Sequence, residues 1–303
     1  MKRLESFLTN LKKMILSHNV TEAESGITVK GFIKWKYQMS HKLFSSFKHN
    51  GGLLVNGSPV YANYVLCAGD TLSIDIEDYN ENKNIIPVEM PLNIIYEDEL
   101  YIAFNKPANV PVHPSFGHHE DTLANGLMFL MKKRGWDNFI IHPVNRIDRD
   151  TSGVVIFAKN KFAHGRVSLE MENGNFKRFY NAVCIGTFEK KEDIIDLPID
   201  RKENSLITRV VNDAGQRAIT KYRVIKENNE LSMLFLELFT GRTHQIRVHL
   251  SHIGHPIWGD TLYGGETDLV NCQQLHSCMI SFPHPLSGNL LKICCKNDLT
   301  FRG

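Results

Sequence analysis

Short hydrophobic runs recur along the chain after about residue 92, and most have the length and composition of β-strands. The run VVIFA at 154–158 is continuous and rich in β-branched residues, which is typical of a strand buried on both faces. Helical patterns are fewer, chiefly at 122–134, 161–172 and 243–253. The other strand-like segments are LNIIYED, LYIAFNK, FYNAVCIG, AITKYRVIK, SMLFLELFT and LLKICCK. Because strands outnumber helices and do not alternate regularly with them, the pattern predicts an α+β fold with a mixed, largely antiparallel sheet.

Upstream of this region the pattern predicts a small α/β module. The segment 33–47 has apolar residues at helical spacing and is followed by two glycines that would end the helix. LLVNGSPV at 53–60 predicts two extended pieces joined by a turn at Asn56-Gly57, and 67–76 predicts a turn into an alternating strand. At the N-terminus, apolar residues at helical spacing predict an amphipathic helix over 4–15.

The distribution of charge divides the chain. From Thr28 to Asn50 there are five lysines and no acidic residue, whereas from Glu77 to Glu99 there are seven acidic residues and one lysine. A lysine-rich helix is as compatible with a solvated face as with nucleic-acid binding. The reversal of charge, with two prolines in the acidic stretch, predicts a linker. We therefore expect an N-terminal extension at 1–25, a small domain at 26–78, a linker at 79–91 and a large domain at 92–303.

Composition narrows the class of protein without identifying it. The 303 residues carry a net charge of +2, so a nucleic-acid partner would have to be bound by locally concentrated charge. No apolar run approaches the roughly 20 residues of a membrane-spanning helix, which predicts a soluble protein with no membrane partner. The six cysteines form no CxxC pair, which favours reduced thiols and a cytoplasmic location.

Two segments concentrate groups that could carry out chemistry. NRIDRDTSG at 145–153 places Asp148 and Asp150 directly before the buried strand, where a rigid sheet can position them; the alternative is a solvated turn. TGRTHQIRVHLSHIGHPIWGDTLYG at 240–264 predicts a helix flanked by arginines and histidines. A phosphate backbone explains these groups better than zinc, because there is no HExxH and no third ligand at a recognisable spacing. Tyr180, in the strand-like KRFYNAVCIG, would by itself be a core residue.

Together these segments resemble the RluA-type family of RNA pseudouridine synthases. The family pattern HRLDxxTSG, followed by an apolar strand and AK, is matched by NRIDRDTSGVVIFAK, and its opening YxDxxLxxxNKPAxxxVHP by YEDELYIAFNKPANVPVHP. The element KxYxAxxxG is matched by RFYNAVCIG, with Arg178 in place of lysine, and the closing GRTHQIRVHLxxxGHPIxGDxxYG by residues 241–264. LHSCMISFPHP is similar to the final signature. Residues 26–76 are similar to the small ribosomal-protein-type (S-four) RNA-binding domain that many of these enzymes carry.

The resemblance implies a pseudouridine synthase fold and an isomerase that converts specific uridines to pseudouridine without a metal or other cofactor. Its RNA partner would be ribosomal RNA, with transfer RNA as the alternative. Asp148 would be the nucleophile, attacking either the ribose anomeric carbon or the uracil ring, and Arg247 would hold its carboxylate in a fork. Tyr180 would stack on the flipped base. Further residues implied to bind RNA or to orient loops are Arg146, Lys106, Arg242, His244, Lys42 and Lys48.

Two departures from the family pattern leave alternatives open. Asn145 replaces a histidine, which keeps a hydrogen-bonding group but loses a titratable ring, and Ile147 replaces a leucine. The intact chemical residues argue against a non-catalytic RNA-binding or ribosome-assembly factor on the same fold. A hydrolase using Asp148 and Asp150 as an acid–base pair would need a fixed separation between the two carboxyl groups, which a loop does not guarantee. The motifs encode neither the uridine that is modified nor the oligomeric state.

Overall fold

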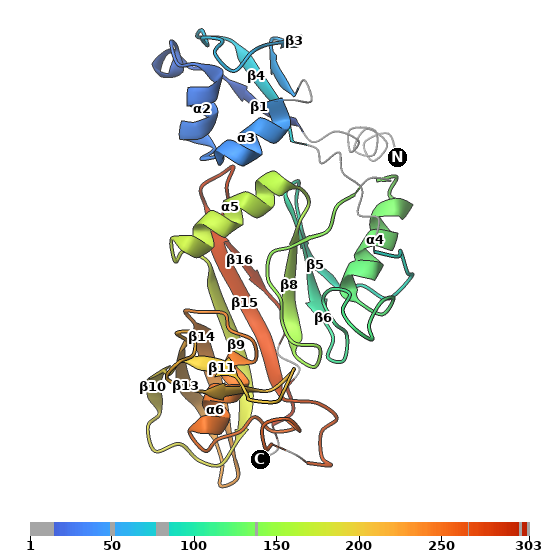
Figure 1. Cartoon of the computed structure of the whole chain (residues 1–303), viewed down its shortest axis with the longest axis vertical. Helices are drawn as coiled ribbons and strands as arrows, with labels where there is room; N and C mark the ends of the chain where they lie inside the picture. The colour runs from blue at the N-terminus through green and yellow to red at the C-terminus, as the bar shows by residue number, and fades with distance from the viewer. Residues whose placement is uncertain are drawn as a thin grey trace.

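The computed structural model describes residues 15–48, 52–76, 85–136, 139–265, 267–296 and 299–301, apart from the side chains of Lys42, Ser46 and Lys48. Within these residues a small sheet domain lies at one end of the molecule and a long sheet carries the remainder (Figure 1). Most of the helix expected at the N-terminus and the part of the chain at 77–84, where the linker was expected to begin, lie outside the described residues. No helix of the described chain has the length and hydrophobicity to cross a membrane.

The small domain has a four-stranded antiparallel sheet in the order β1-β4-β2-β3. The strands are β1 Ile15–Asn19, β2 Leu53–Val55, β3 Ser58–Pro59 and β4 Thr71–Asp75, and a short 3-10 helix, η1 Glu22–Glu24, follows β1. Asn56 and Gly57 have φ of 51° and 79°, the left-handed pair that a tight hairpin turn requires, so the predicted hairpin is confirmed. The small domain begins before residue 26, where we expected its start, because β1 is part of its sheet. Leu16 in β1 faces the core while its neighbours face solvent.

The segment predicted as one helix at 33–47 forms two, and that prediction is wrong. The helices are α2 Val29–Lys36 and α3 His41–Lys48. Gln38, with a left-handed φ of 47°, interrupts the helical path between them, and the hydroxyls of Thr28 and Ser40 accept backbone hydrogen bonds at the two separate N-termini.

The turn between these helices contacts the large domain. Tyr37 packs edge to face against Phe162 of helix α5 (Lys161–Glu172), with ring centroids 6.0 Å apart. Next to it, the side-chain oxygen of Gln38 accepts a hydrogen bond from Arg166 Nη1 at 2.9 Å. The break in the helical pattern therefore serves the packing of one domain on the other.

The large domain is built on a sheet in the order β10-β13-β14-β9-β15-β8-β6-β5, with β16 pairing β15 and β7 pairing β8. Among the described strand pairs only β8 and β15 run parallel, so the predicted mixed, largely antiparallel α+β fold is confirmed. The elements are β5 Ile94–Glu97, β6 Tyr101–Lys106, α4 Leu123–Lys133, β7 His142–Pro143, β8 Ser152–Ala158, α5 Lys161–Glu172, β9 Lys177–Ile185, β10 Glu192–Asp196, β11 Ile199–Arg201, β12 Arg209–Val211, β13 Ile219–Glu227, β14 Leu231–Leu238, α6 Gln245–His252, β15 Leu275–Pro283 and β16 Leu290–Cys294.

Strand β8 runs through the middle of the core and is buried on both faces, as its sequence predicts. Val154 and Ile156 pack in one hydrophobic cluster with residues of α5 and of the small domain. Val155 and Phe157 pack in a second cluster with residues of α4 and α6. The strand therefore fixes in place the turn that precedes it, at residues 148–151.

Gly153 pairs with Ser277 of β15 and has φ of 112°. A Cβ added there would lie 2.7 Å from the backbone nitrogen of Ser277 and closer still to its carbonyl oxygen. We expect Gly153→Ala to lower the free energy of unfolding by about 2–4 kcal/mol, measured by urea denaturation, because neither backbone atom can move without disturbing the pairing. Gly174→Ala is the matched control: φ is 73°, but an added Cβ meets nothing within 4 Å, so only the backbone cost of about 1 kcal/mol applies. Equal losses in the two variants would contradict the steric explanation.

Candidate active site

Asp148 lies in the turn between β7 and β8, and 27% of its side chain is exposed. The backbone N–H of Thr151 donates to the carbonyl of Asp148 at 3.1 Å, which closes the turn. Gln273 Nε2 donates to the Thr151 hydroxyl at 2.6 Å and ties the turn to the segment before β15. The carboxylate therefore projects from a fixed backbone rather than from a mobile loop.

Lys106, at the end of β6, supports the same turn from inside the protein. The residue is completely buried, and its Nζ donates to the carbonyl oxygens of Pro107, Val110 and Arg149 at 2.8, 2.6 and 2.8 Å. The sequence left open whether Lys106 binds RNA or orients a loop. Burial leaves it no surface for RNA, and its bond to Arg149 joins it to the backbone next to Asp148.

The stability of the protein should depend on pH through this lysine. Burial lowers the pKa of Lys106 to about 7, below the value of about 10.4 for an unfolded lysine. Between these values Lys106 is mostly neutral in the folded protein and mostly protonated in the unfolded chain. Folding must therefore remove a proton from the lysine, and the free energy that this requires decreases as the pH rises. We expect the free energy of unfolding to increase by up to about 1.4 kcal/mol per pH unit from about pH 7 to 10, and Lys106→Met to lack this increase. Urea denaturation at several pH values measures both proteins; parallel profiles would sink the explanation.

Asn145 is held by the backbone of β8. Its Nδ2 donates to the carbonyl of Val154 at 3.0 Å, and its Oδ1 accepts from the N–H of Ile156 at 2.9 Å. The residue is buried, with 7% of its surface exposed. An amide provides one donor and one acceptor in this position, so the residue that departs from the family histidine fastens the turn to the sheet.

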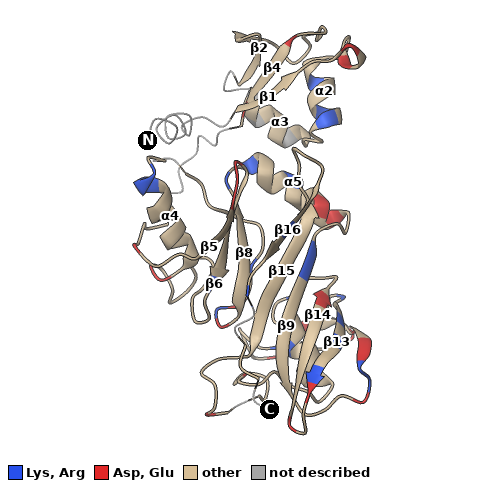
Figure 2. Cartoon of the chain, turned by 180° about the vertical axis from the view of Figure 1, so that it is seen from behind, with Lys and Arg blue, Asp and Glu red and all other residues tan. Residues whose placement is uncertain are grey.

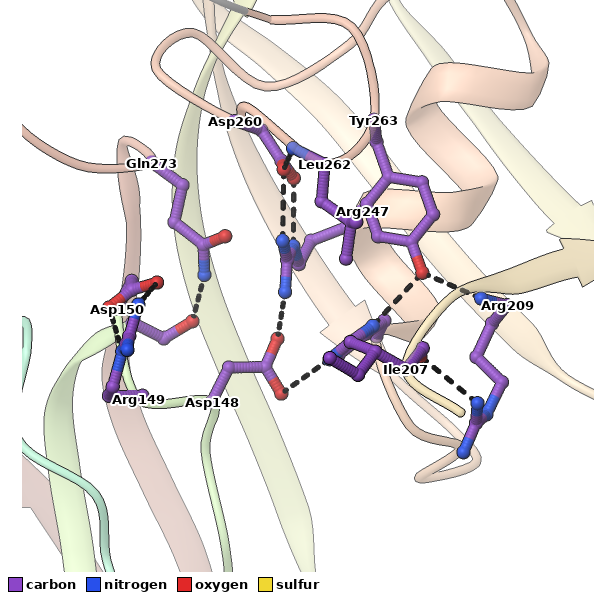
Figure 3. Close-up of polar contacts among 12 residues, drawn as sticks. Asp148, Arg149, Asp150, Ile207, Arg209, Arg247, Asp260, Leu262, Tyr263 and Gln273 are labelled. Atoms are coloured by element: carbon purple, nitrogen blue, oxygen red, sulfur yellow. Dashed lines mark hydrogen bonds and ion pairs between the residues drawn. The ribbon is translucent and has the colours of Figure 1, made fainter. Parts of the chain in front are cut away.

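Arg247, on α6, joins two carboxylates from opposite sides (Figure 3). Its Nε and Nη2 donate to Asp260 at 2.7 and 2.9 Å, and its Nη1 donates to Asp148 at 3.1 Å. The predicted bidentate contact of Arg247 with Asp148 is therefore wrong. The guanidinium makes its bidentate contact with Asp260, whose side chain is fully buried, and donates a single bond to Asp148. Burial by itself would lower the pKa of Arg247, but the hydrogen bonds that it donates to Asp260 and the charges of the two carboxylates raise it, so the guanidinium stays charged.

His244 and Tyr263 border the other side of Asp148. His244, which precedes α6 with a left-handed φ of 58°, places Nε2 at 4.0 Å from Asp148 Oδ1 and Nδ1 at 2.9 Å from the hydroxyl of Tyr263. That hydroxyl also accepts the backbone N–H of Arg209, and the Tyr263 ring lies 5.0 Å from the Arg247 guanidinium. Burial lowers the pKa of His244, although the charge of Asp148 opposes this shift. We therefore expect the imidazole of His244, next to the carboxylate of Asp148, to be uncharged.

Tyr180 lies in β9, with 6% of its surface exposed. Burial raises the pKa of its phenol; the charge of Arg178 opposes the shift and that of Asp148 adds to it. The structure thus brings Asp148 into contact with Arg247, 99 residues away in sequence, and close enough to Tyr180 for its charge to act on the phenol.

The remaining predicted residues are placed differently from one another. Arg146 is exposed, whereas Arg242 bonds with Gln216 and with the carbonyl of Arg217 and thereby links the loop before α6 to the segment before β13. The side chains of Lys42 and Lys48 lie outside the described residues.

Of the histidines weighed as zinc ligands, His249 bonds with Thr220 and the carbonyl of Leu197. Asp150 pairs with Arg149 at 2.7 Å, so the two carboxylates of the turn have separate arginine partners (Figure 3).

Asp260 and Tyr263 are the residues of this site that sequence reasoning did not assign. Both belong to the segment WGDTLYG, which contains no local signal that its aspartate would face a helix. The only indication available was indirect: a buried arginine needs a counter-charge, and its nearest acidic neighbour in sequence on the C-terminal side is Asp260.

Comparisons with known proteins show the family and the fold of the chain. A family model described as RNA pseudouridylate synthase matches residues 100–252, a range that includes Asp148, Tyr180 and Arg247. The "Uncharacterized RNA pseudouridine synthase YjbO" of Bacillus subtilis is 41% identical over 250 residues, 82% of this chain and 88% of the relative. The "Ribosomal large subunit pseudouridine synthase D" of Vibrio cholerae is 34% identical over 263 residues, 80% and 78% of the two chains. A solved structure, "Human RNA Pseudouridylate Synthase Domain Containing 1", shares the fold with a TM-score of 0.58 at 24% identity, covering 68% of this chain and 83% of that one.

Proposed function

The chain belongs to the RNA pseudouridylate synthase family, and on that premise we propose that it converts uridine to pseudouridine in ribosomal RNA with Asp148 as the nucleophile. The observation that carries the role of Asp148 is its contact with Arg247. A partly exposed carboxylate, on a rigid turn, accepts one bond from a buried guanidinium that a second carboxylate already holds. Such a carboxylate is accessible to substrate and fixed in direction, as a nucleophile must be.

The reaction rearranges bonds within one nucleotide. The bond between uracil N1 and ribose C1′ breaks, a bond between C5 and C1′ forms, the proton on C5 leaves and N1 gains one. Asp148 attacks either C1′ or the uracil ring and is expelled when the ring rejoins through carbon. Its covalent participation divides one difficult substitution into two easier steps.

The other groups of the site position the nucleophile and the base. Arg247 keeps the carboxylate oriented and offsets its charge through one hydrogen bond, while Asp260 holds the guanidinium from behind. Because only 6% of Tyr180 is exposed, its contact with a flipped uracil is limited to the accessible edge of the ring. A uridine in folded RNA must leave its stack to meet these groups.

We assign the small domain the task of binding RNA. Figure 2 shows basic residues on α2, where Lys30 and Lys34 are exposed, and Trp35 beside them is 61% exposed. Lys36 is partly neutralised by Glu24 at 3.0 Å. Positive charge next to an exposed aromatic ring supports contact with phosphates and unstacked bases.

The experiment supplies unmodified ribosomal RNA and unmodified transfer RNA separately and measures the pseudouridine content of each after digestion to nucleosides. Pseudouridine in the ribosomal RNA supports the proposal. Pseudouridine in transfer RNA alone would mean that the proposed reaction is right and that the proposed substrate is wrong. If neither RNA gains pseudouridine although the protein binds them, the non-catalytic assembly factor becomes the better account.

A further inference from the structure

Arg178, in β9, carries a positive charge that no acidic side chain of the described chain neutralises. Within the described residues its guanidinium makes no hydrogen bond or ion pair, and its Nε is buried without a partner. Two other enclosed arginines of the large domain have acidic partners. Arg247 contacts two carboxylates, and Arg166 pairs with Glu170 at 3.6 Å and bonds with Gln38.

An uncompensated charge of this kind is unfavourable in the free protein. Burial lowers the pKa of Arg178, and the interaction that opposes this shift comes from Tyr180, which is not an acid at neutral pH. Enclosed charges are normally paired, and enclosed donors are normally hydrogen-bonded, because desolvation is otherwise costly. A group left in this state at the edge of a site is expected to be completed by a ligand.

The position of Arg178 places such a ligand beside the nucleophile. Arg178 and Tyr180 are two residues apart in one strand, so their side chains leave β9 on the same face. The charges of Arg178 and Asp148 both act on the pKa of the Tyr180 phenol, in opposite directions. The three side chains therefore share one region, between β9 and the turn that carries Asp148.

The loop before α6 leaves room for this guanidinium. A Cβ added to Gly241 would collide with Arg178 Nη1, whereas no positive φ obliges this residue to be glycine. Gly241 thus provides space rather than an unusual backbone conformation. The same loop carries Arg242 and His244, so the guanidinium lies under a segment that borders the site.

We propose that Arg178 binds a phosphate of the RNA backbone next to the target uridine, and that this phosphate supplies the counter-charge that the protein lacks. A guanidinium presents donors in a planar fork that matches two phosphate oxygens. The proposal rests on the proposed function, because it takes the ligand of the site to be RNA. A phosphate gripped here anchors the nucleotide by its backbone while the base enters the site.

Arg178→Met tests the proposal, since methionine keeps much of the apolar stem and removes the charge. We expect the dissociation constant for an unmodified ribosomal RNA transcript to rise about 10- to 100-fold at low salt. The slope of log affinity against log salt concentration should become shallower by about 1, the signature of one lost phosphate contact. The melting temperature should stay constant or rise, because the variant removes an unpaired enclosed charge.

Two further variants separate binding from general charge. Lys190→Gln removes one positive charge from an exposed residue that pairs with Asp193 at 2.7 Å, and it should leave the salt slope unchanged. Gly241→Ala should displace the guanidinium and weaken RNA binding in the same direction as Arg178→Met. A melting temperature that falls in Arg178→Met while the salt slope stays native would assign Arg178 to the fold and overturn the proposal.

The result can be distinguished from failure of the proposed function. If the native protein forms pseudouridine and Arg178→Met keeps the native salt slope, the phosphate site alone is wrong. If the native protein forms no pseudouridine and Arg178→Met makes the slope shallower, the enzymatic proposal fails and the phosphate site stands.

Discussion

Asp148→Asn should reduce the formation of pseudouridine by at least about 1000-fold, because an amide cannot act as the nucleophile that an ionised carboxylate provides. The fold should survive, since Asp260 continues to neutralise Arg247 and an asparagine oxygen can still accept the bond from Nη1. RNA affinity should not fall, since the change removes a negative charge from a site that receives a polyanion. Nucleoside analysis of the digested RNA measures the first effect and filter binding the second.

Asp150→Asn is the matched control for this variant. It lies in the same turn and loses the same charge, but its partner is Arg149 and it contacts neither Arg247 nor Asp260 in the described structure. Its activity should remain close to native. A large loss in Asp150→Asn with Asp148→Asn still active would exchange their roles. Comparable losses in both would contradict the assignment of the nucleophile to Asp148 alone.

Asp260→Asn should be the second most damaging change, although Asp260 is fully buried and never meets the substrate. The substitution removes the charge that faces the fork of Arg247 and leaves the guanidinium free to turn toward Asp148. We expect a loss of about 2–4 kcal/mol in the free energy of unfolding, because one member of a buried ion pair is left without its main partner. Activity should fall about 100-fold, since a small misplacement of a catalytic group costs rates of that order.

The double variant Arg247→Met with Asp260→Leu separates these two effects. Replacing both members of a buried pair by apolar side chains removes the uncompensated charge, so stability should return toward the native value. Activity should stay low, because Asp148 has lost its orienting bond. If Asp260→Asn alone keeps native stability and native rates, the role that we give to Asp260 is wrong.

The sequence predicted those features that depend on local periodicity or on recognisable motifs. The run at 154–158 is continuous because both faces of β8 are buried, and the Asn56-Gly57 turn follows from backbone conformation alone. In contrast, the single helix expected at 33–47 was wrong because its apolar spacing continues across the break. The left-handed turn at Gln38 is supported by contacts with α5 of the other domain, which no local pattern records.

The site shows the same division. The meeting of Asp148 with Arg247 was anticipated only through the family resemblance. The fork on Asp260 was missed because ion pairing depends on how a helix and a distant loop are placed in space. Likewise, the sequence left two roles open for Lys106, and only burial with three carbonyl partners distinguishes them. From the sequence, Arg178 was noted only as a replacement for the lysine of the family pattern. Its lack of an acidic partner in the described structure depends on residues that are distant in sequence, so no local pattern predicts it.

The release of tritium from ribosomal RNA labelled at carbon 5 of uridine tests the central claim most directly, because that hydrogen leaves only when C5 forms the new bond to the ribose. The native protein should release tritium in step with the appearance of pseudouridine, and Asp148→Asn, assayed beside it on the same RNA, should release none above background. Release that persists undiminished in Asp148→Asn, or no release by the native protein from an RNA that it binds, would contradict the account.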